Sequence, residues 1–400
     1  MSHDLLERAA TGSRLTPAEG LALFHVPLLE LGLAADARCR QLHPQPVRTF
    51  VIGRNVNYTN VCVSHCRFCA FSRGARSLEA FLLTTDEVLA KIAEMVAAGG
   101  TEVLMQGGLH PDLRLAWYEE LFRAIRAAFP SVDLHALSPT EIVHLSTLEN
   151  VPVPDVLARL RSAGLSSLPG GGAEILVDRV RQLVSPRKCL ADAWLGAMRE
   201  AHRLGLPTTA TMMYGHLETL EERIAHLERV RALQDETGGF LGFIPWPFQP
   251  GRTALARRRP IREGDAAEFL RMLAISRLFL DNVPNVQSSW VTQGLKVGQM
   301  GLCFGANDLG STMMEENVVS AAGTTFRTNA DELAALIADL GWGAAQRNTR
   351  YEVVRGYAEG LPREDQAGGP VGHREDGKNG KNVLVCERGS FPLNAWENFS

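Results

Sequence analysis

The sequence predicts an α/β protein built as a (β/α)8 TIM-type barrel, complete or slightly open, with N-terminal helices and a C-terminal extension. Between residues 48 and 345, short apolar or β-branched runs alternate with amphipathic stretches, which indicates parallel βαβ units. Polar and glycine-rich clusters follow nearly every apolar run, at the points where a barrel builds its active-site face. A doubly wound open sheet, the alternative, would concentrate its chemistry in one crevice.

Three segments are expected along the chain. Residues 1–47 form a helical segment and a linker that contains Pro44 and Pro46. Residues 48–345 form the barrel. Residues 346–400 form an extension that is charged and rich in glycine from about residue 357, a composition typical of partial disorder.

The individual elements follow from hydrophobic periodicity and capping signals. Eight runs are predicted as strands, at residues 49–56, 101–106, 132–138, 165–170, 208–213, 240–245, 285–291 and 303–310. Helices are predicted between and after these runs, at residues 88–99, 117–129, 155–164, 194–205, 223–234, 265–280 and 331–341. Thr84 with Glu87, and Thr219 with Glu222, have the spacing of a capping box at a helix start.

Charge and hydropathy exclude several classes of protein. The 400 residues carry 41 Lys and Arg against 45 Asp and Glu, a formal net charge of −4, so no basic excess exists to bind nucleic-acid phosphates. No apolar run approaches the ~18 residues of a membrane span. The N-terminus has no basic region followed by an apolar stretch, so we expect a cytoplasmic protein.

Three cysteines lie within eight residues, directly after the first predicted strand. Cys62, Cys66 and Cys69 have the spacing C-x3-C-x2-C, and their thiolates can bind one metal centre. A structural zinc site would need a fourth ligand; His65 lies in the same loop, but no second Cys or His pair follows. A centre with three thiolate ligands leaves one metal position open, as catalytic sites do.

A glycine pair follows the second predicted strand. Gln106, Gly107 and Gly108 let the backbone approach a ligand closely and direct its N–H and C=O groups toward it. A tight turn between strand and helix is the alternative role for the glycines.

Carboxylates follow the third and fourth predicted strands. Ser138 and Glu141 belong to one cluster, and Glu174 follows three glycines in the other. Each glutamate can bind ribose hydroxyls, take a proton, or stabilise the first turn of a helix.

Other candidates lie at or near strand ends. His110, His135 and His216 are possible bases or substrate donors, although a structural role is the alternative for each. Asn307 and Asp308 end the eighth unit, where a barrel often places ligand contacts.

Two segments between residues 245 and 259 have distinctive compositions. Residues 245–250, PWPFQP, are stiff and aromatic, and can form a wall against a flat substrate or a packed loop. Arg252 and residues 257–259 are predicted as a solvated run of arginines.

The cysteine spacing, with Phe68 before the last cysteine, resembles the radical S-adenosylmethionine superfamily. The resemblance implies a 4Fe–4S cluster bound by Cys62, Cys66 and Cys69, and S-adenosylmethionine bound at the remaining iron. It implies one-electron cleavage to a 5′-deoxyadenosyl radical, with the electron from a flavodoxin or ferredoxin. Phe68, Gln106, Gly107, Gly108, Ser138 and Glu141 are the residues that we assign to the cosubstrate on this basis, although the superfamily's usual glutamate is absent from the Gly-Gly segment.

Longer segments resemble one subfamily. NVNYTNVC, CRFCAF, MQGGLHPD, HALSPTEI, PGGGAEILVD and TTATMMYGHLET are similar to aminofutalosine synthases, deazaflavin cofactor (FO) synthase subunits and cyclic dehypoxanthinyl futalosine synthases. FIPWPFQP, SSWVTQG and FGANDLGSTMMEENVVSAAG most resemble the last group. Ser72, where that group would have an aromatic residue, and the long C-terminal tail depart from the pattern.

The resemblance implies a step of menaquinone biosynthesis. The radical would take hydrogen from ribose C4′ of dehypoxanthinyl futalosine, and the C4′ radical would add to the substrate's own benzoate ring. Glu174, Glu141, His216 and Asp308 are the candidate catalytic residues for the proton that the ring then loses. Aminofutalosine synthase and FO synthase subunit are the alternative enzymes, and a non-catalytic metal scaffold is the alternative from another class.

Overall fold

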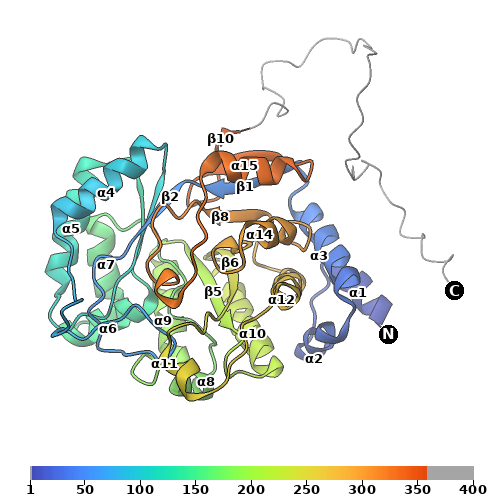
Figure 1. Ribbon diagram of the computed structural model, residues 1–400, viewed down its shortest axis with the longest axis horizontal. Helices are drawn as coiled ribbons and strands as arrows, with labels where there is room; N and C mark the ends of the chain where they lie inside the picture. The colour runs from blue at the N-terminus through green and yellow to red at the C-terminus, as the bar shows by residue number, and fades with distance from the viewer. Residues whose placement is uncertain (1, 358–400) are drawn as a thin grey trace, which may run out of the picture.

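The structure is a computed structural model that describes residues 2–357 (Figure 1). Its strands form three sheets, with the orders β10-β9-β1-β8, β2-β3-β4 and β5-β6-β7. All pairings are parallel except that of β10 with β9. The strands are β1 Val47–Val51, β2 Gly53–Val56, β3 Glu102–Met105, β4 Asp133–Ala136, β5 Thr208–Tyr214, β6 Phe240–Pro247, β7 Asn285–Val286, β8 Asp308–Ser311, β9 Gly343–Arg347 and β10 Val353–Gly356.

Isolated bridges connect the three sheets into one curved wall. Ser167 pairs with His135 of β4, and Leu168 pairs with Thr208 of β5. Gln287 pairs with Asp308, which joins β7 to β8. The predicted barrel is therefore confirmed in its slightly open form.

One predicted strand is much shorter than expected. Residues 165–170 contribute only single bridges, because Pro169 has no N–H to donate and three glycines follow it. The segment still occupies the position between β4 and β5, so the order of the wall is the predicted one.

Helices cover the outside of this wall, and Figure 1 shows α4, α5 and α7 beyond β2. The helices after the first strands are α4 Thr85–Ala97, α5 Leu115–Ala128, α6 Pro139–Glu149, α7 Val153–Ala163, α8 Asp178–Val184, α9 Ala191–Arg203, α10 Leu220–Thr237, α11 Ala254–Arg258, α12 Ala266–Phe279, α13 Trp290–Gln293, α14 Leu295–Gly301, η2 Ser320–Ala322 and α15 Ala330–Ala338. The capping boxes predicted at Thr84 and Thr219 are both present. None of the helices within residues 2–357 is long and apolar enough to cross a membrane.

The N-terminal helices pack on the outside of the barrel. They are α1 Ser2–Ala10, α2 Pro17–Ala22, η1 Leu23–His25 and α3 Leu28–Leu42. In Figure 1, α3 lies beside α12 and α2 lies near α10. Gly32 of α3 also lets this helix pack closely on the segment between α14 and β8, because a Cβ there would lie 2.6 Å from the Phe304 ring.

Residue 345, where the predicted barrel ends, lies within strand β9. β9 continues through residue 347 and pairs with β1, and β10 turns back against it. The first part of the expected extension, residues 346–357, is therefore ordered against the wall. The predicted disorder of the tail concerns residues 358–400, which lie outside the described residues.

Candidate active site

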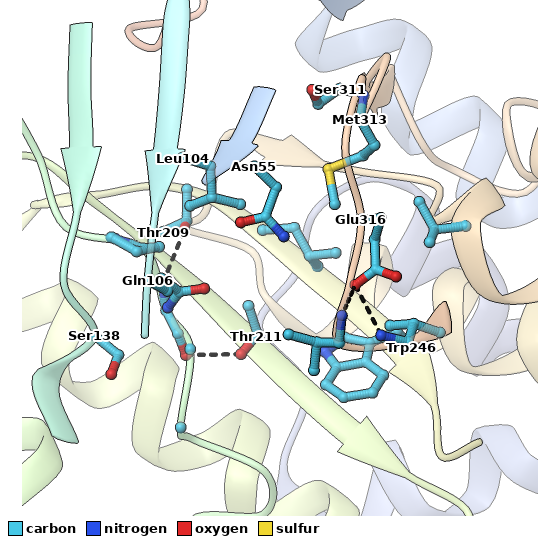
Figure 2. Close-up of a pocket in the computed structure, with 18 of the residues that line it drawn as sticks. Asn55, Leu104, Gln106, Ser138, Thr209, Thr211, Trp246, Ser311, Met313 and Glu316 are labelled. Atoms are coloured by element: carbon cyan, nitrogen blue, oxygen red, sulfur yellow. Dashed lines mark hydrogen bonds between the residues drawn. The ribbon is translucent and has the colours of Figure 1, made fainter. Parts of the chain in front are cut away.

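A cavity of about 410 Å³ lies at the carboxyl ends of the strands. Cys62, Cys66 and Cys69 all line it. Figure 2 shows Gln106 and Thr211 on one side and Trp246 on the other. The cavity thus combines a polar side, which can hydrogen-bond hydroxyl groups, with an aromatic side, as ligand pockets commonly do.

Backbone hydrogen bonds hold the cysteine loop, residues 57–81, against other parts of the barrel. The N–H of Val63 donates to the carbonyl oxygen of Leu109 at 3.0 Å, and that of Arg67 donates to Val184 at 2.8 Å. Within the loop, the N–H of Cys69 donates to the carbonyl oxygen of Cys66 at 3.1 Å. The thiols are therefore presented from a fixed backbone.

The three cysteines fit a 4Fe–4S cluster. All are free thiols, and they share one loop and one cavity. Among residues 2–357, no three His, Cys, Asp or Glu side chains are grouped closely enough to bind a single metal ion. In a 4Fe–4S cluster each thiolate binds a different iron, so the three sulfurs need not converge on one ion. Burial raises the pKa of the Cys66 thiol to about 11, so a thiolate here needs the positive charge of a metal.

The predicted glycine pair packs directly on the cysteine loop. A Cβ on Gly107 would lie 2.5 Å from the Tyr58 ring, and one on Gly108 would lie 2.2 Å from the carbonyl oxygen of Val61. The two glycines therefore have a packing role, because only they let the end of β3 approach Cys62.

Glu141 joins three elements beside the cavity. Its Oε2 accepts hydrogen bonds from the N–H and hydroxyl of Ser138, which completes the capping box of α6. Its Oε1 accepts from the N–H of Gly107 at 3.0 Å and from the hydroxyl of Tyr58 at 2.8 Å. Burial raises the pKa of Glu141 against the opposing effect of these bonds. Both oxygens are occupied, which favours a positioning role over proton transfer.

Glu174 is the candidate carboxylate with a free oxygen. The backbone adopts a left-handed φ of 44° there, and Ala173 separates Glu174 from the three glycines. Oε1 accepts a hydrogen bond from the ammonium of Lys188 at 2.6 Å. Oε2 is buried and has no hydrogen-bond partner, and Glu174 lines the cavity. An unpaired buried carboxylate oxygen is available to a ligand or a proton.

Lys188 is a site residue that sequence analysis missed. Its ammonium lies 5.1 Å from the centre of the Phe68 ring and also lines the cavity. Burial acts to lower the pKa of Lys188, but the neighbouring Cys66 and Glu174 outweigh it and hold the pKa above its usual value. The only feature of the sequence that distinguishes Lys188 is that lysine is rare, since the chain has five lysines in 400 residues.

The structure places two predicted catalytic residues away from the cavity lining. The His216 ring is buried and bonds Glu218 at 2.9 Å and the carbonyl oxygen of Met213 at 3.0 Å. Asp308 is fully buried and forms a double hydrogen bond with Arg347, at 2.6 and 3.0 Å. The imidazole of His216 and the carboxylate of Asp308 are thus each occupied by protein partners, which argues against contact with substrate.

Of the remaining candidates, His135 lines the cavity, whereas His110 and Asn307 do not. The Nδ1 of His135 lies 2.6 Å from the Ser167 hydroxyl. The Nδ1 of His110 accepts the N–H of Asp112. Asn307 is buried and binds the guanidinium of Arg277.

The aromatic segment at residues 245–250, whose first half is the end of β6, contributes one wall residue. Trp246 lines the cavity, whereas Phe248 is buried against His216. Figure 2 shows Glu316 next to Trp246. Glu316 accepts hydrogen bonds from the N–H groups of Val318 and Val319 at 2.8 Å, and so shapes the loop on this side of the cavity.

Arg347 and Tyr351 line the cavity from beyond the predicted barrel. The Arg347 guanidinium stacks 3.9 Å from the centre of the Tyr351 ring. Burial acts to lower the pKa of Arg347, but Asp308 raises it above its usual value, so the guanidinium keeps its positive charge. Sequence analysis missed both residues, because it ended the barrel at residue 345.

Comparison with known proteins agrees with this geometry. Residues 56–230 match the family model of the radical SAM superfamily, and residues 237–359 match that of the CofH/MqnC C-terminal region. The chain is 46% identical over 356 residues to the cyclic dehypoxanthine futalosine synthase of Halalkalibacterium halodurans, covering 89% of this chain and 95% of the relative. The chain belongs to the radical S-adenosylmethionine superfamily. The enzyme therefore uses a 4Fe–4S cluster and S-adenosylmethionine, as its cysteine loop predicts.

Of two further relatives, one carries the same enzyme name and the other a different one. The chain is 44% identical to the cyclic dehypoxanthine futalosine synthase of Streptomyces coelicolor, covering 92% of each protein. It is 42% identical to the 5-amino-6-(D-ribitylamino)uracil–L-tyrosine 4-hydroxyphenyl transferase 1 of Methanosarcina barkeri, covering 90% of this chain and 96% of the relative.

Solved structures agree on the fold of this radical S-adenosylmethionine enzyme. Methylornithine synthase (PylB) superposes with a TM-score of 0.66 at 17% identity, covering 84% of this chain and 96% of PylB. The hydrogenase maturase HydG superposes with a TM-score of 0.67 at 16% identity, covering 86% of this chain and 75% of HydG.

Proposed function

We propose that the enzyme converts dehypoxanthinyl futalosine to its cyclic product, a step of menaquinone biosynthesis. The observation that carries this proposal is the identity of 46% and 44% to two cyclic dehypoxanthine futalosine synthases, over 95% and 92% of their lengths. The cavity supports it, because the substrate joins a sugar to a benzoate ring and the lining joins a polar side to an aromatic one.

Cys62, Cys66 and Cys69 would hold the 4Fe–4S cluster, which together with S-adenosylmethionine would supply a 5′-deoxyadenosyl radical when both are bound. The chain's own task is to hold one flexible substrate folded, with ribose C4′ toward these cysteines and the sugar against its own ring. Such positioning can supply ~7–11 kcal/mol of the barrier. Gln106 and Thr211 are placed to bind hydroxyl groups, and Trp246 is placed to pack on the ring (Figure 2).

Glu174 is the residue that we propose takes the proton lost by the ring. Its Oε2 is buried beside the cavity and has no hydrogen-bond partner, while its Oε1 accepts a hydrogen bond from Lys188. The ring must also lose one electron, which would return to the oxidised 4Fe–4S cluster and so replace the electron spent on cleaving S-adenosylmethionine.

A second candidate function is the transfer of a 4-hydroxyphenyl group, which the 42% identity to the Methanosarcina barkeri enzyme supports. Anaerobic assays of the reconstituted enzyme separate the candidates. We expect dehypoxanthinyl futalosine alone to stimulate formation of 5′-deoxyadenosine and to yield a cyclic product. Stimulation by 5-amino-6-ribitylaminouracil with tyrosine would replace this function with the transferase, and a requirement for enolpyruvyl benzoate would replace it with aminofutalosine synthase.

A further inference from the structure

A second hollow lies against the cysteine loop. Its volume is about 400 Å³, and Cys69 and Ser72 line both it and the substrate cavity. It opens at the protein surface, because Arg252 and Arg257 in its lining are exposed. Cys69 therefore lies between the substrate cavity and the outside of the molecule.

The lining of this hollow is basic and contains no acidic residue. Arg73, Arg252 and Arg257 line it, together with Cys69, Ala70, Ser72, Ala254 and Ala321. Arg73 pairs with Glu79, and Arg257 donates to the carbonyl oxygen of Arg252 at 3.0 Å. Among the described residues, no hydrogen bond or ion pair occupies the guanidinium of Arg252.

The surrounding sequence extends this charge into a surface that we name the arginine surface. Residues 248–262 contain five arginines and no acidic residue, and residues 57–79 contain three arginines and one glutamate. The arginine surface consists of Arg73, Arg252 and Arg257, which line the hollow, and the adjoining segments add the exposed Arg76, Arg258 and Arg259. It is a local excess of positive charge on a chain whose formal net charge is −4.

The two segments of the arginine surface are fixed to each other. The N–H of Leu255 donates to the carbonyl oxygen of Arg67 at 2.7 Å. A Cβ on Gly251 would lie 2.0 Å from the carbonyl oxygen of Ala322, so the start of the second segment is packed tightly on the loop after β8. A surface that is already ordered loses little entropy when a partner binds.

We propose that the arginine surface docks a small acidic protein that carries one electron to the cluster beside Cys69. The carrier loses one electron and the 4Fe–4S cluster gains it, and no bond forms or breaks at the interface. Complementary charge steers such a partner to this face, while the net negative charge of the remaining surface repels it elsewhere. The inference requires radical S-adenosylmethionine chemistry, and it holds for either candidate substrate.

Charge reversal tests the proposal on the reconstituted holoenzyme. The variant R252E/R257E changes the arginine surface by four charge units. The control, R161E/R203E, makes the same change at the last turns of α7 and α9, where neither arginine lines the hollow. The variant R252K/R257K keeps the charge. Thermal unfolding first establishes that all three variants are folded.

Two measurements use a bacterial flavodoxin as the probe. Titration calorimetry measures its binding to each holoenzyme, and anaerobic stopped-flow absorbance measures cluster reduction by its reduced form and by dithionite. We expect R252E/R257E to weaken binding and slow reduction by flavodoxin at least tenfold at low salt, with the rate for dithionite unchanged. R252K/R257K and R161E/R203E should stay within about twofold of the wild type. Added salt should reduce the difference between R252E/R257E and the wild type.

Three outcomes would overturn the proposal. Equal losses in R252E/R257E and R161E/R203E would show that net charge, and not this surface, governs association. An equal loss with dithionite would show that the variant disturbs the cluster itself. Unchanged flavodoxin binding combined with lost binding of inorganic phosphate would assign the hollow to a small anion. Neither a failed futalosine assay nor its success bears on these measurements, so the two proposals fail separately.

Discussion

At the scale of single residues, Cys66 is the most enclosed of the three loop cysteines. It is 7% exposed, and its sulfur lies 3.2 Å from the Ser64 hydroxyl. Cys62 and Cys69 are more open and lie at the ends of the motif. A cluster bound by all three is therefore shielded on one side and reachable on the other.

Replacing Cys62, Cys66 or Cys69 by Ala should abolish assembly of the catalytic cluster, because each thiolate binds its own iron. Iron counting and absorbance after anaerobic reconstitution measure this directly. Alanine variants of the cysteines outside the loop (Cys39, Cys189 and Cys303) should retain the cluster. A folded Cys189→Ala protein without a cluster would contradict the assignment.

Glu174→Gln should separate two steps of the proposed reaction. Substrate deuterated at ribose C4′ should still deliver deuterium into 5′-deoxyadenosine, because that step needs no base. Cyclic product should fall by ~10²–10⁴-fold, the usual cost of removing a base. A fall of equal size in deuterium transfer and product would instead make Glu174 a binding residue.

At the scale of elements, the site depends on how closely the end of β3 approaches the cysteine loop. The N–H of Gly108 donates to the carbonyl oxygen of Thr59 at 3.0 Å, which connects the two segments. Glu141 adds a second connection from the start of α6. The loop is therefore positioned by its neighbours, although its own sequence carries the ligands.

Gly108→Ala should lower the free energy of unfolding by ~1–3 kcal/mol, because the new methyl group meets the Val61 carbonyl. It should also lower the iron content per folded protein, since the cysteine loop must shift. Chemical denaturation and iron counting test both effects. Gly196→Ala is the matched control, because a Cβ there meets nothing within 4 Å and alanine favours the helix. An equally stable, iron-replete Gly108→Ala protein would contradict this account.

At the scale of the whole molecule, Asp308 and Arg347 join both ends of the barrel. Asp308 lies on β8, Arg347 on β9, and the hydroxyl of Thr49 on β1 donates to Asp308 at 2.6 Å. These three strands are neighbours in one sheet, so the ion pair fastens the last units of the chain to the first strand.

Asp308→Asn should cost ~3–5 kcal/mol of unfolding free energy, because it leaves the buried guanidinium of Arg347 without a counter-charge. Glu200→Gln is the control; it removes an exposed pair with Arg203, whose expected contribution is ~0–1 kcal/mol. Denaturant titration gives the stability of each variant. Product formation per folded molecule should persist in Asp308→Asn, whereas its loss in a stably folded protein would restore Asp308 as a catalytic candidate.

Local sequence signals determined much of this protein. The alternation of strands and helices, the capping boxes at Thr84 and Thr219, and the cysteine motif are properties of neighbouring residues. Backbone propensity and ligand spacing act over short distances, so they can be recognised in the sequence itself. The family resemblance rests on the same short segments.

Only the tertiary structure decided which polar side chains face the cavity. Glu174 and His216 both follow strands, yet Glu174 has an unpaired oxygen beside the cavity, whereas the His216 ring is buried next to Glu218 and does not line the cavity. Lys188 and Arg347 reach the site from segments without a motif. Side-chain direction and pairing depend on contacts between residues far apart in the chain. Those contacts cannot be inferred from the periodicity of a single segment.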